Sequence, residues 1–239
     1  MEETNFQPEV SNPRQSQNLL IIAVIIGVAI IAAGAVILLN NNSANVAASD
    51  YAGLQYSRTE DGGFVLGNPQ APVTIVEFAD YACSHCIEYL ETMNRFIETY
   101  VKTGKAKFEY RTFPTSGREV TVYMGTVAVC LNEQREGAFW DAKDEFYQLA
   151  ATGQYNGNSG RVVTEKLSLD YTKVLNCLQT ERQVETDINL GSQLGVGGTP
   201  AVLVRIGNGE PKWIEALGRT WDQGGVPYEA IAAVVEQNQ

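Results

Sequence analysis

Residues 71–86 read APVTIVEFADYACSHC, an apolar, β-branched run followed after a few residues by two cysteines with two residues between them. The run Val73–Phe78 predicts a buried strand. From Cys83 onward, apolar residues recur every three or four positions, which predicts a helix that ends near Gly104. Both cysteines therefore fall at the N-terminus of a helix that directly follows a buried strand.

The motif Cys83-Ser84-His85-Cys86 in this position predicts a redox-active cysteine pair. Free N–H groups and the positive end of the helix dipole stabilise Cys83 as a thiolate. Cys86, one turn deeper, is placed to close a disulfide with it, and His85 adds positive charge or a hydrogen bond. A static disulfide and half of a zinc site are the alternatives. We expect no metal, because His85 is the only histidine and the chain has no second cysteine pair of this spacing.

The rest of the chain supplies more strands and a helical block. Lys107–Phe113 and Ala201–Ile206 predict two further strands, and a Gly-Asn-Gly turn leads into a third, Lys212–Leu217. Residues 116–194 have mostly helical periodicity, and Pro227 opens a last helix. The predicted order is β-α-β, helical block, β-β-α.

A second motif, Leu194-Gly-Val-Gly-Gly-Thr-Pro200, precedes the strand at Ala201. Together with residues 71–86, it resembles the DsbA-like thiol–disulfide oxidoreductases, whose α/β thioredoxin fold carries an inserted helical domain. The resemblance spans about residues 60–236 and implies one domain over residues 64–239, with its helical insert at about 116–194. It also implies that the protein is an enzyme that needs no cofactor.

The resemblance implies a role for each matching residue. Cys83 is the sulfur that attacks and is attacked, and Cys86 is the resolving thiol. Thr199 and a cis Pro200 border the cleft in which an extended substrate backbone pairs. Glu77 corresponds to a buried acid that moves a proton to or from Cys86. From the residues alone, an ordinary strand carboxylate at Glu77 and a trans turn proline at Pro200 remain alternatives.

The other two cysteines, Cys130 and Cys177, lie in the helical block. Both fall on or beside apolar helix stripes, so both can face the interior between packed helices. We predict a structural disulfide between them in an oxidising compartment. Two buried free thiols that pack as small hydrophobic groups are the alternative.

The N-terminal part of the chain predicts a membrane anchor. Leu19–Leu39 contains only Leu, Ile, Val, Ala and Gly, and 21 helical residues span roughly 31 Å, enough to cross a bilayer core. Arg14 places residues 1–18 in the cytoplasm as a polar tail. Residues 40–63 are predicted to be a flexible linker. A cleaved signal and a buried core helix are the alternatives.

These expectations combine into one function. A net charge of -11 argues against nucleic-acid binding. We expect a single-pass protein of the cell membrane whose extracytoplasmic domain oxidises cysteines of unfolded or reduced exported proteins. A membrane redox partner of the DsbB or vitamin K epoxide reductase type would reoxidise it. Because Ser84 stands where the family often has proline, a reductase or isomerase remains an alternative, as does a metal- or peptide-binding module without enzymatic activity.

Overall fold

The computed structural model describes residues 50–239 of the chain. The predicted tail and membrane anchor, and the linker up to residue 49, lie outside the described residues. Among the helices of residues 50–239, none combines the length and apolar character needed to cross a bilayer.

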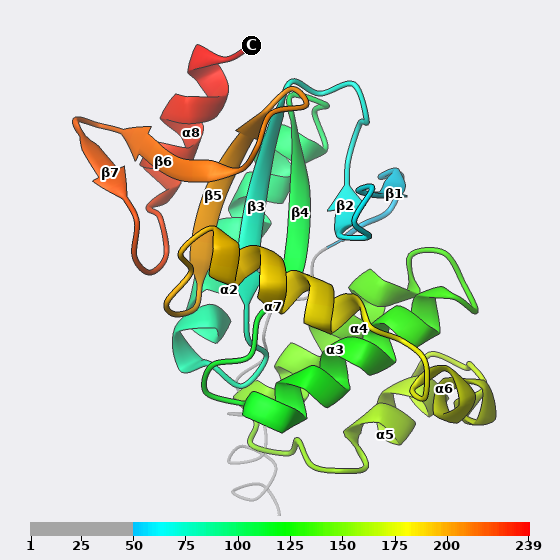
Figure 1. Ribbon diagram of the computed structural model, residues 1–239. Helices are drawn as coiled ribbons and strands as arrows, with labels where there is room; N and C mark the ends of the chain where they lie inside the picture. Colours follow the sequence, from blue (N-terminus) through cyan, green and yellow to red (C-terminus); the bar gives the residue numbers. More distant parts are fainter. Residues whose placement is uncertain (1–49) are drawn as a thin grey trace, which may run out of the picture. The chain divides into compact units, whose positions relative to one another are not determined.

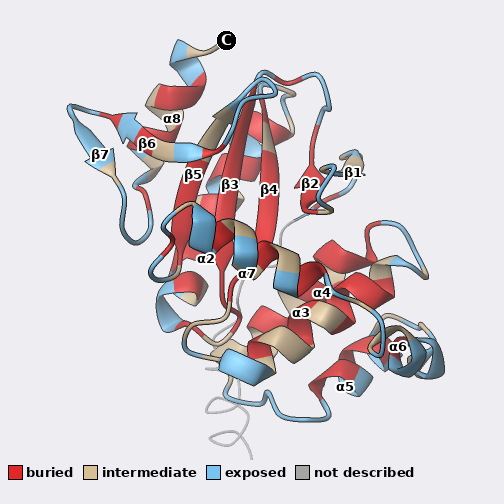
Figure 2. Cartoon of the chain, viewed as in Figure 1, coloured by how far each residue is buried: buried red, intermediate tan, exposed pale blue. Residues whose placement is uncertain are grey.

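A seven-stranded sheet in the order β1-β2-β4-β3-β5-β6-β7 forms the centre of the domain (Figure 1). The apolar run at residues 73–79 is its middle strand, β3, which is buried along its whole length (Figure 2). It pairs in parallel with β4 and antiparallel with β5. The strands are β1 Tyr56–Arg58, β2 Phe64–Leu66, β3 Val73–Ala79, β4 Ala106–Thr112, β5 Ala201–Ile206, β6 Lys212–Ala216 and β7 Arg219–Trp221.

The short strands β1, β2 and β7 were not predicted, because three residues are too few to show a period. Their presence corrects the predicted linker at residues 40–63. From residue 50 onward that stretch belongs to the domain: Tyr51 is buried, and β1 pairs with β2. Polar composition indicates a flexible segment, but side-chain contacts with distant residues, such as Tyr51 with Asp144 and Asp61 with Arg111, join this one to the domain.

Helices cover both faces of the sheet, and β3 alternates between them. Helix α2, Ser84–Phe96, continues in a π-helical turn, Ile97–Val101, and packs with α8, Tyr228–Gln237, on the face to which Ile75 points. Helix α7, Gln183–Gln193, covers the opposite face, where Val76 and Phe78 pack. Figure 1 shows α7 in front of the sheet and α2 behind it.

The predicted helical insert is present between β4 and β5. Its helices are α3 Arg118–Asn132, α4 Ala138–Ala151, α5 Ser159–Lys166, α6 Tyr171–Cys177 and α7. A disulfide joins Cys130 of α3 to Cys177 of α6, with the two Cα atoms 5.8 Å apart. Phe139 of α4 stacks on Phe64 of β2, so the insert packs directly against the sheet.

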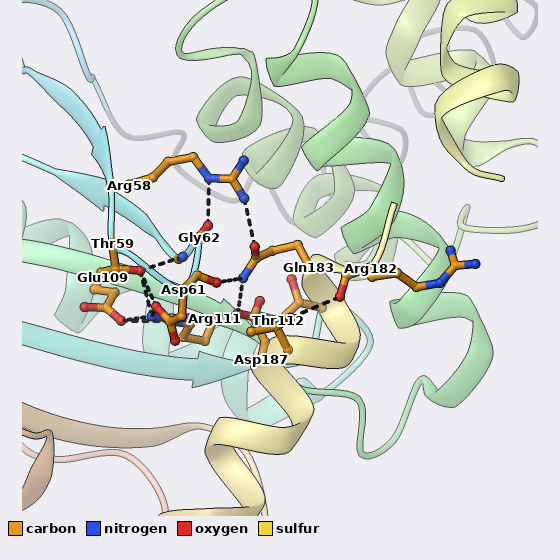
Figure 3. A network of polar contacts seen from close by, with 12 residues as sticks. Arg58, Thr59, Asp61, Gly62, Glu109, Arg111, Thr112, Arg182, Gln183 and Asp187 are labelled. Carbon is orange, nitrogen blue, oxygen red and sulfur yellow. Dashed lines mark hydrogen bonds and ion pairs between the residues drawn. The ribbon is translucent and has the colours of Figure 1, made fainter. Parts of the chain in front are cut away.

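A buried charge cluster ties the insert to the sheet on the α7 side (Figure 3). Arg111 of β4 has no exposed side-chain surface and binds three carboxylates: Glu109 at 2.7 Å, Asp61 at 2.7 Å and Asp187 at 3.0 Å. Asp61 comes from the β1–β2 turn and Asp187 from α7. Losing one partner of such a buried cluster would leave charge unpaired, which costs several kcal/mol. Arg111 therefore fixes α7, and the loop that follows it, against the sheet.

Candidate active site

The two cysteines of the motif lie where the sequence predicts them, at the start of α2. Cys83 is the N-cap residue, its backbone N–H donating to the Asp80 carbonyl at 3.1 Å and its carbonyl accepting from Ile87 at 3.1 Å. Cys86 lies one turn further along the helix. Both are free thiols. Cys83 is only 4% exposed and Cys86 is fully buried, so the reactive end of the helix is more enclosed than a helix terminus alone would suggest.

The loop before β5 lies opposite Cys83. The peptide bond between Thr199 and Pro200 is cis. The Cys83 thiol donates a hydrogen bond to the Thr199 carbonyl at 3.3 Å. The two motifs, more than a hundred residues apart in sequence, thus meet at the sulfur of Cys83.

A groove of about 410 Å³ opens beside this contact. Its lining comprises His85, Glu88, Tyr89, Thr92, Thr199, Pro200, Gly224 and Gly225. The Tyr89 hydroxyl donates to the Val226 carbonyl at 2.7 Å and accepts from the Val226 N–H at 3.2 Å, which holds the glycine segment in place. Sequence reasoning did not identify this segment, because it lies outside both motifs. The groove can hold an extended peptide next to Cys83.

Glu77 lies within β3, 2% exposed. Its Oε1 atom is buried and has no hydrogen-bond partner within residues 50–239. Burial raises the pKa of Glu77 to about 7, and the positive charge of Lys143 opposes that rise. Glu77 therefore exchanges a proton close to neutral pH, which an ordinary strand carboxylate does not.

Cys86 shares this buried environment. Burial raises the pKa of the Cys86 thiol well above its usual range, and the charge of Glu77 raises it further. The backbone N–H of Asp80, 3.5 Å from the Cys86 sulfur, acts in the opposite direction. Cys86 therefore stays protonated at neutral pH, and ionisation of Glu77 raises the pKa of its thiol further.

Lys143 of α4 is a functional candidate that the sequence did not reveal. It is 2% exposed, donates to Asp144 Oδ1 at 2.7 Å and lies 5.3 Å from the centre of the Tyr147 ring. The hydroxyls of Tyr147 and Tyr110 are 3.0 Å apart. The insert thus contributes a buried positive charge and Tyr147 to the region of Glu77, and β4 contributes Tyr110.

Asp80 is a second residue that sequence reasoning missed. It is fully buried, and its carboxylate accepts hydrogen bonds from the N–H groups of Ala82, Thr115 and Gly117 at 2.7–2.8 Å. The hydroxyls of Thr115 and Thr121 also donate to it. Burial alone would raise the pKa of Asp80, but these hydrogen bonds outweigh burial and hold it below its usual value. Asp80 is therefore an ionised carboxylate at neutral pH.

The remaining predicted features can also be placed. Ser84 and His85 are exposed between the two cysteines. Among residues 50–239, no third metal-binding side chain approaches Cys83 and Cys86. The one group of side chains there that could hold a metal ion is Glu133, Cys177 and Glu181, and the sulfur of Cys177 is already bonded in the disulfide.

A thioredoxin-like sheet with a helical insert, and two free thiols at a helix start facing a cis-proline loop, define a DsbA-like thiol–disulfide oxidoreductase. Residues 59–220 match the sequence model of the thioredoxin family, and the chain belongs to this family.

One relative in sequence and two solved structures illustrate the similarity to known proteins. "Probable disulfide bond formation protein D" of Bacillus anthracis is 27% identical over 154 residues, covering 58% of this chain and 68% of that protein. The α-DsbA1 crystal structure from Wolbachia pipientis has a TM-score of 0.59 at 19% identity, covering 76% of this chain and 92% of that one. The oxidised BdbD structure from Bacillus subtilis has a TM-score of 0.52 at 21% identity, with coverages of 73% and 91%.

Proposed function

We propose that the protein introduces disulfides into exported proteins, using Cys83 and Cys86 as its redox-active pair. The observation that carries this proposal is the arrangement of the pair: Cys83 faces the Thr199 carbonyl at the groove, while Cys86 is buried beside the proton-exchanging Glu77. The name of the Bacillus anthracis relative supports disulfide formation as the direction.

In the oxidising cycle, a substrate thiolate attacks the sulfur of Cys83. The Cys83–Cys86 bond breaks, a mixed disulfide forms, and Cys86 leaves as a thiolate. Because the Cys86 thiol has a raised pKa, this thiolate takes up a proton readily, and Glu77 is the buried acid placed to supply it. A second substrate thiolate then attacks the substrate sulfur of the mixed disulfide. Two electrons pass to the enzyme, and Cys83 is released reduced.

Thr199 and Pro200 hold the substrate during this exchange. The groove beside them is lined mainly by small or apolar groups and accepts an extended backbone from an unfolded protein. His85, exposed at the edge of the groove, stabilises the Cys83 thiolate. An oxidised membrane partner of the DsbB or vitamin K epoxide reductase type restores the Cys83–Cys86 disulfide.

The proposal places the catalytic domain outside the cytoplasm. The 21-residue apolar stretch at 19–39 anchors the protein with residues 1–18 inside. A disulfide between Cys130 and Cys177 is consistent with an oxidising compartment.

The test is turnover with a reduced, unfolded protein substrate, glutathione disulfide serving as the oxidant. We expect catalytic formation of substrate disulfides by the wild type and no turnover by Cys83→Ser. Cys86→Ser cannot form the Cys83–Cys86 disulfide, so it should lose turnover and accumulate a mixed disulfide between Cys83 and glutathione, with one glutathione thiolate released. Catalysed reduction of substrate disulfides without oxidation would favour a reductase, and absence of turnover in both directions would favour a binding module.

A further inference from the structure

The turn into α2 and the start of the helical insert meet at the side chain of Asp80. Thr115 in turn connects Asp80 to the cis-proline loop. We propose that Asp80 and Thr115 form a positioning clamp that holds Thr199 against the Cys83–Cys86 helix. The clamp makes the first residues of the insert a part of the catalytic geometry.

The clamp is a chain of two short contacts. Thr115 Oγ1 lies 3.1 Å from Asp80 Oδ2, and its backbone N–H donates to the same oxygen at 2.7 Å. Thr115 Oγ1 also lies 2.6 Å from Thr199 Oγ1. The backbone of Asp80 contacts both cysteines, accepting from the N–H of Cys83 and donating to the sulfur of Cys86. Asp80 and Thr115 thus connect the thiol pair to the residue that faces it.

The charge of Asp80 fixes the direction of these hydrogen bonds. A carboxylate only accepts, so the Thr115 hydroxyl donates its single proton to Asp80. Thr199 must then donate to Thr115, because the Thr115 proton is already used. The contact with Thr115 holds the Oγ1 atom of Thr199, and a β-branched side chain has few χ1 rotamers that place this atom there. The carbonyl of the same residue lies 3.3 Å from the sulfur of Cys83.

Close packing at Gly117 supports the clamp independently. A Cβ atom there would lie 2.2 Å from Thr121 Oγ1 and 2.8 Å from both Asp80 Oδ1 and Ala82 Cβ. The insert therefore approaches the Cys83 turn so closely that only a glycine fits between them. Thr121, buried in α3, closes the contact by donating to Asp80 Oδ1.

The clamp rests on thiol–disulfide exchange at Cys83 and holds for either direction of the reaction. Small misplacements of a binding group reduce rates steeply. Thr115→Val removes the hydroxyl while keeping the branched shape and the backbone contact to Asp80. Loss of the hydroxyl should lower kcat/KM for peptide substrates about tenfold, which corresponds to one hydrogen bond.

The test uses the purified full chain with a dithiol peptide and with the matching disulfide peptide. We expect Thr115→Val to lower kcat/KM about tenfold in both directions, with Thr115→Ser recovering most of the loss. Alkylation of Cys83 by iodoacetamide, which needs no peptide-binding loop, should change less than twofold. Thr126→Val is the matched control: Thr126 is also half-buried, but its hydroxyl bonds only to the Val122 carbonyl of its own helix.

A double-mutant cycle separates the clamp from a general packing effect. If Thr199 acts through Thr115, Thr199→Val should cost about as much as Thr115→Val, and the double variant no more than either one. Thr199→Val also keeps the proposal testable if Thr115→Val does not fold. Three results would overturn the clamp. The first is a kcat/KM of Thr115→Val within twofold of the wild type, and the second is an equal loss of kcat/KM in Thr115→Ser and Thr115→Val. The third is a double variant whose loss is the sum of the two single losses. Failure of the oxidising function leaves these rate ratios unaffected, so the two outcomes are distinguishable.

Discussion

Glu77 and Asp80 lie three residues apart on the same segment, both almost fully buried, yet their carboxyl groups behave in opposite ways. Glu77 is inside β3, where the neighbouring N–H groups are taken up by the sheet ladder with β4 and β5. Asp80 comes just after the strand, where turns offer free N–H groups to its carboxylate. Burial therefore raises the pKa of Glu77 to about 7, whereas hydrogen bonds overcome burial and lower the pKa of Asp80. One acid exchanges protons and the other supplies a fixed charge.

The largest effect is expected for Asp80→Asn. An asparagine amide has one acceptor oxygen, whereas the carboxylate has two. Its NH₂ group would face N–H and O–H donors that now bind the second oxygen, so these buried donors would lose their acceptor. We expect the free energy of unfolding to fall by about 4 kcal/mol. Urea unfolding of the protein at pH 8 measures it, with Glu77→Gln as the matched buried control, which should not lose stability. A loss below about 1 kcal/mol would show that the five hydrogen bonds of Asp80 contribute little.

Glu77→Gln should change how stability depends on pH. The folded pKa of Glu77, about 7, is higher than its ordinary value of 4.5, so the folded state holds an extra proton between these values. The stability that this proton contributes is complete below pH 4.5 and is lost as pH rises through 7. Glu77→Gln should therefore become more stable relative to wild type across this range, by up to about 3 kcal/mol above pH 7.

Unfolding curves at pH 5, 6, 7 and 8 provide the measurement. Burial also raises the pKa of Asp187, to about 6, but this group is present in both proteins and cancels in the difference. Parallel stability curves for wild type and Glu77→Gln would mean that Glu77 titrates in its ordinary range.

Lys143→Met should raise the pKa of Glu77 above about 7, because the positive charge of Lys143 is what opposes the effect of burial. The carboxyl resonance of Glu77, followed by carbon NMR against pH, reports the shift directly. Lys166→Met removes an exposed positive charge from the same insert and should leave the midpoint unchanged. A downward shift or no shift in Lys143→Met would contradict the assigned role of Lys143.

The smallest effect is expected outside the buried region, at His85. His85→Ala removes a group that stabilises the reduced pair, so it should lower the redox potential by up to about 30 mV, or about 1.4 kcal/mol. Equilibration with glutathione measures the change, and Ser84→Ala, also exposed between the cysteines, is the control. An unchanged or higher potential in His85→Ala would leave the helix terminus as the source of thiolate stabilisation.

The sequence predicted the strand and the helix of this site, because both depend on local patterns of apolar residues. The run Val73–Phe78 and the helix from Cys83 appear at the predicted places because a buried strand and an amphipathic helix have distinct periods. The resemblance to DsbA-like proteins identified Glu77, Thr199 and Pro200 as candidate site residues. The structure places all of these residues in one region.

Asp80, Thr115 and Lys143 could not be predicted in the same way. Asp80 and Thr115 are ordinary turn residues until the fold brings them together across 35 positions. A lysine within a helix is normally exposed, but packing of the insert buries Lys143. Such contacts depend on tertiary structure, and the local sequence carries no signal for them.

The equilibrium redox potential of the Cys83–Cys86 pair tests the central claim most directly. The claim is that this pair oxidises the cysteines of exported proteins, with a reduced state stabilised at the start of α2. Equilibration of the purified protein against glutathione, with the free thiols quantified by alkylation, gives the potential. We predict a value of about -120 mV, whereas a value of about -270 mV would identify a reductant and contradict the claim.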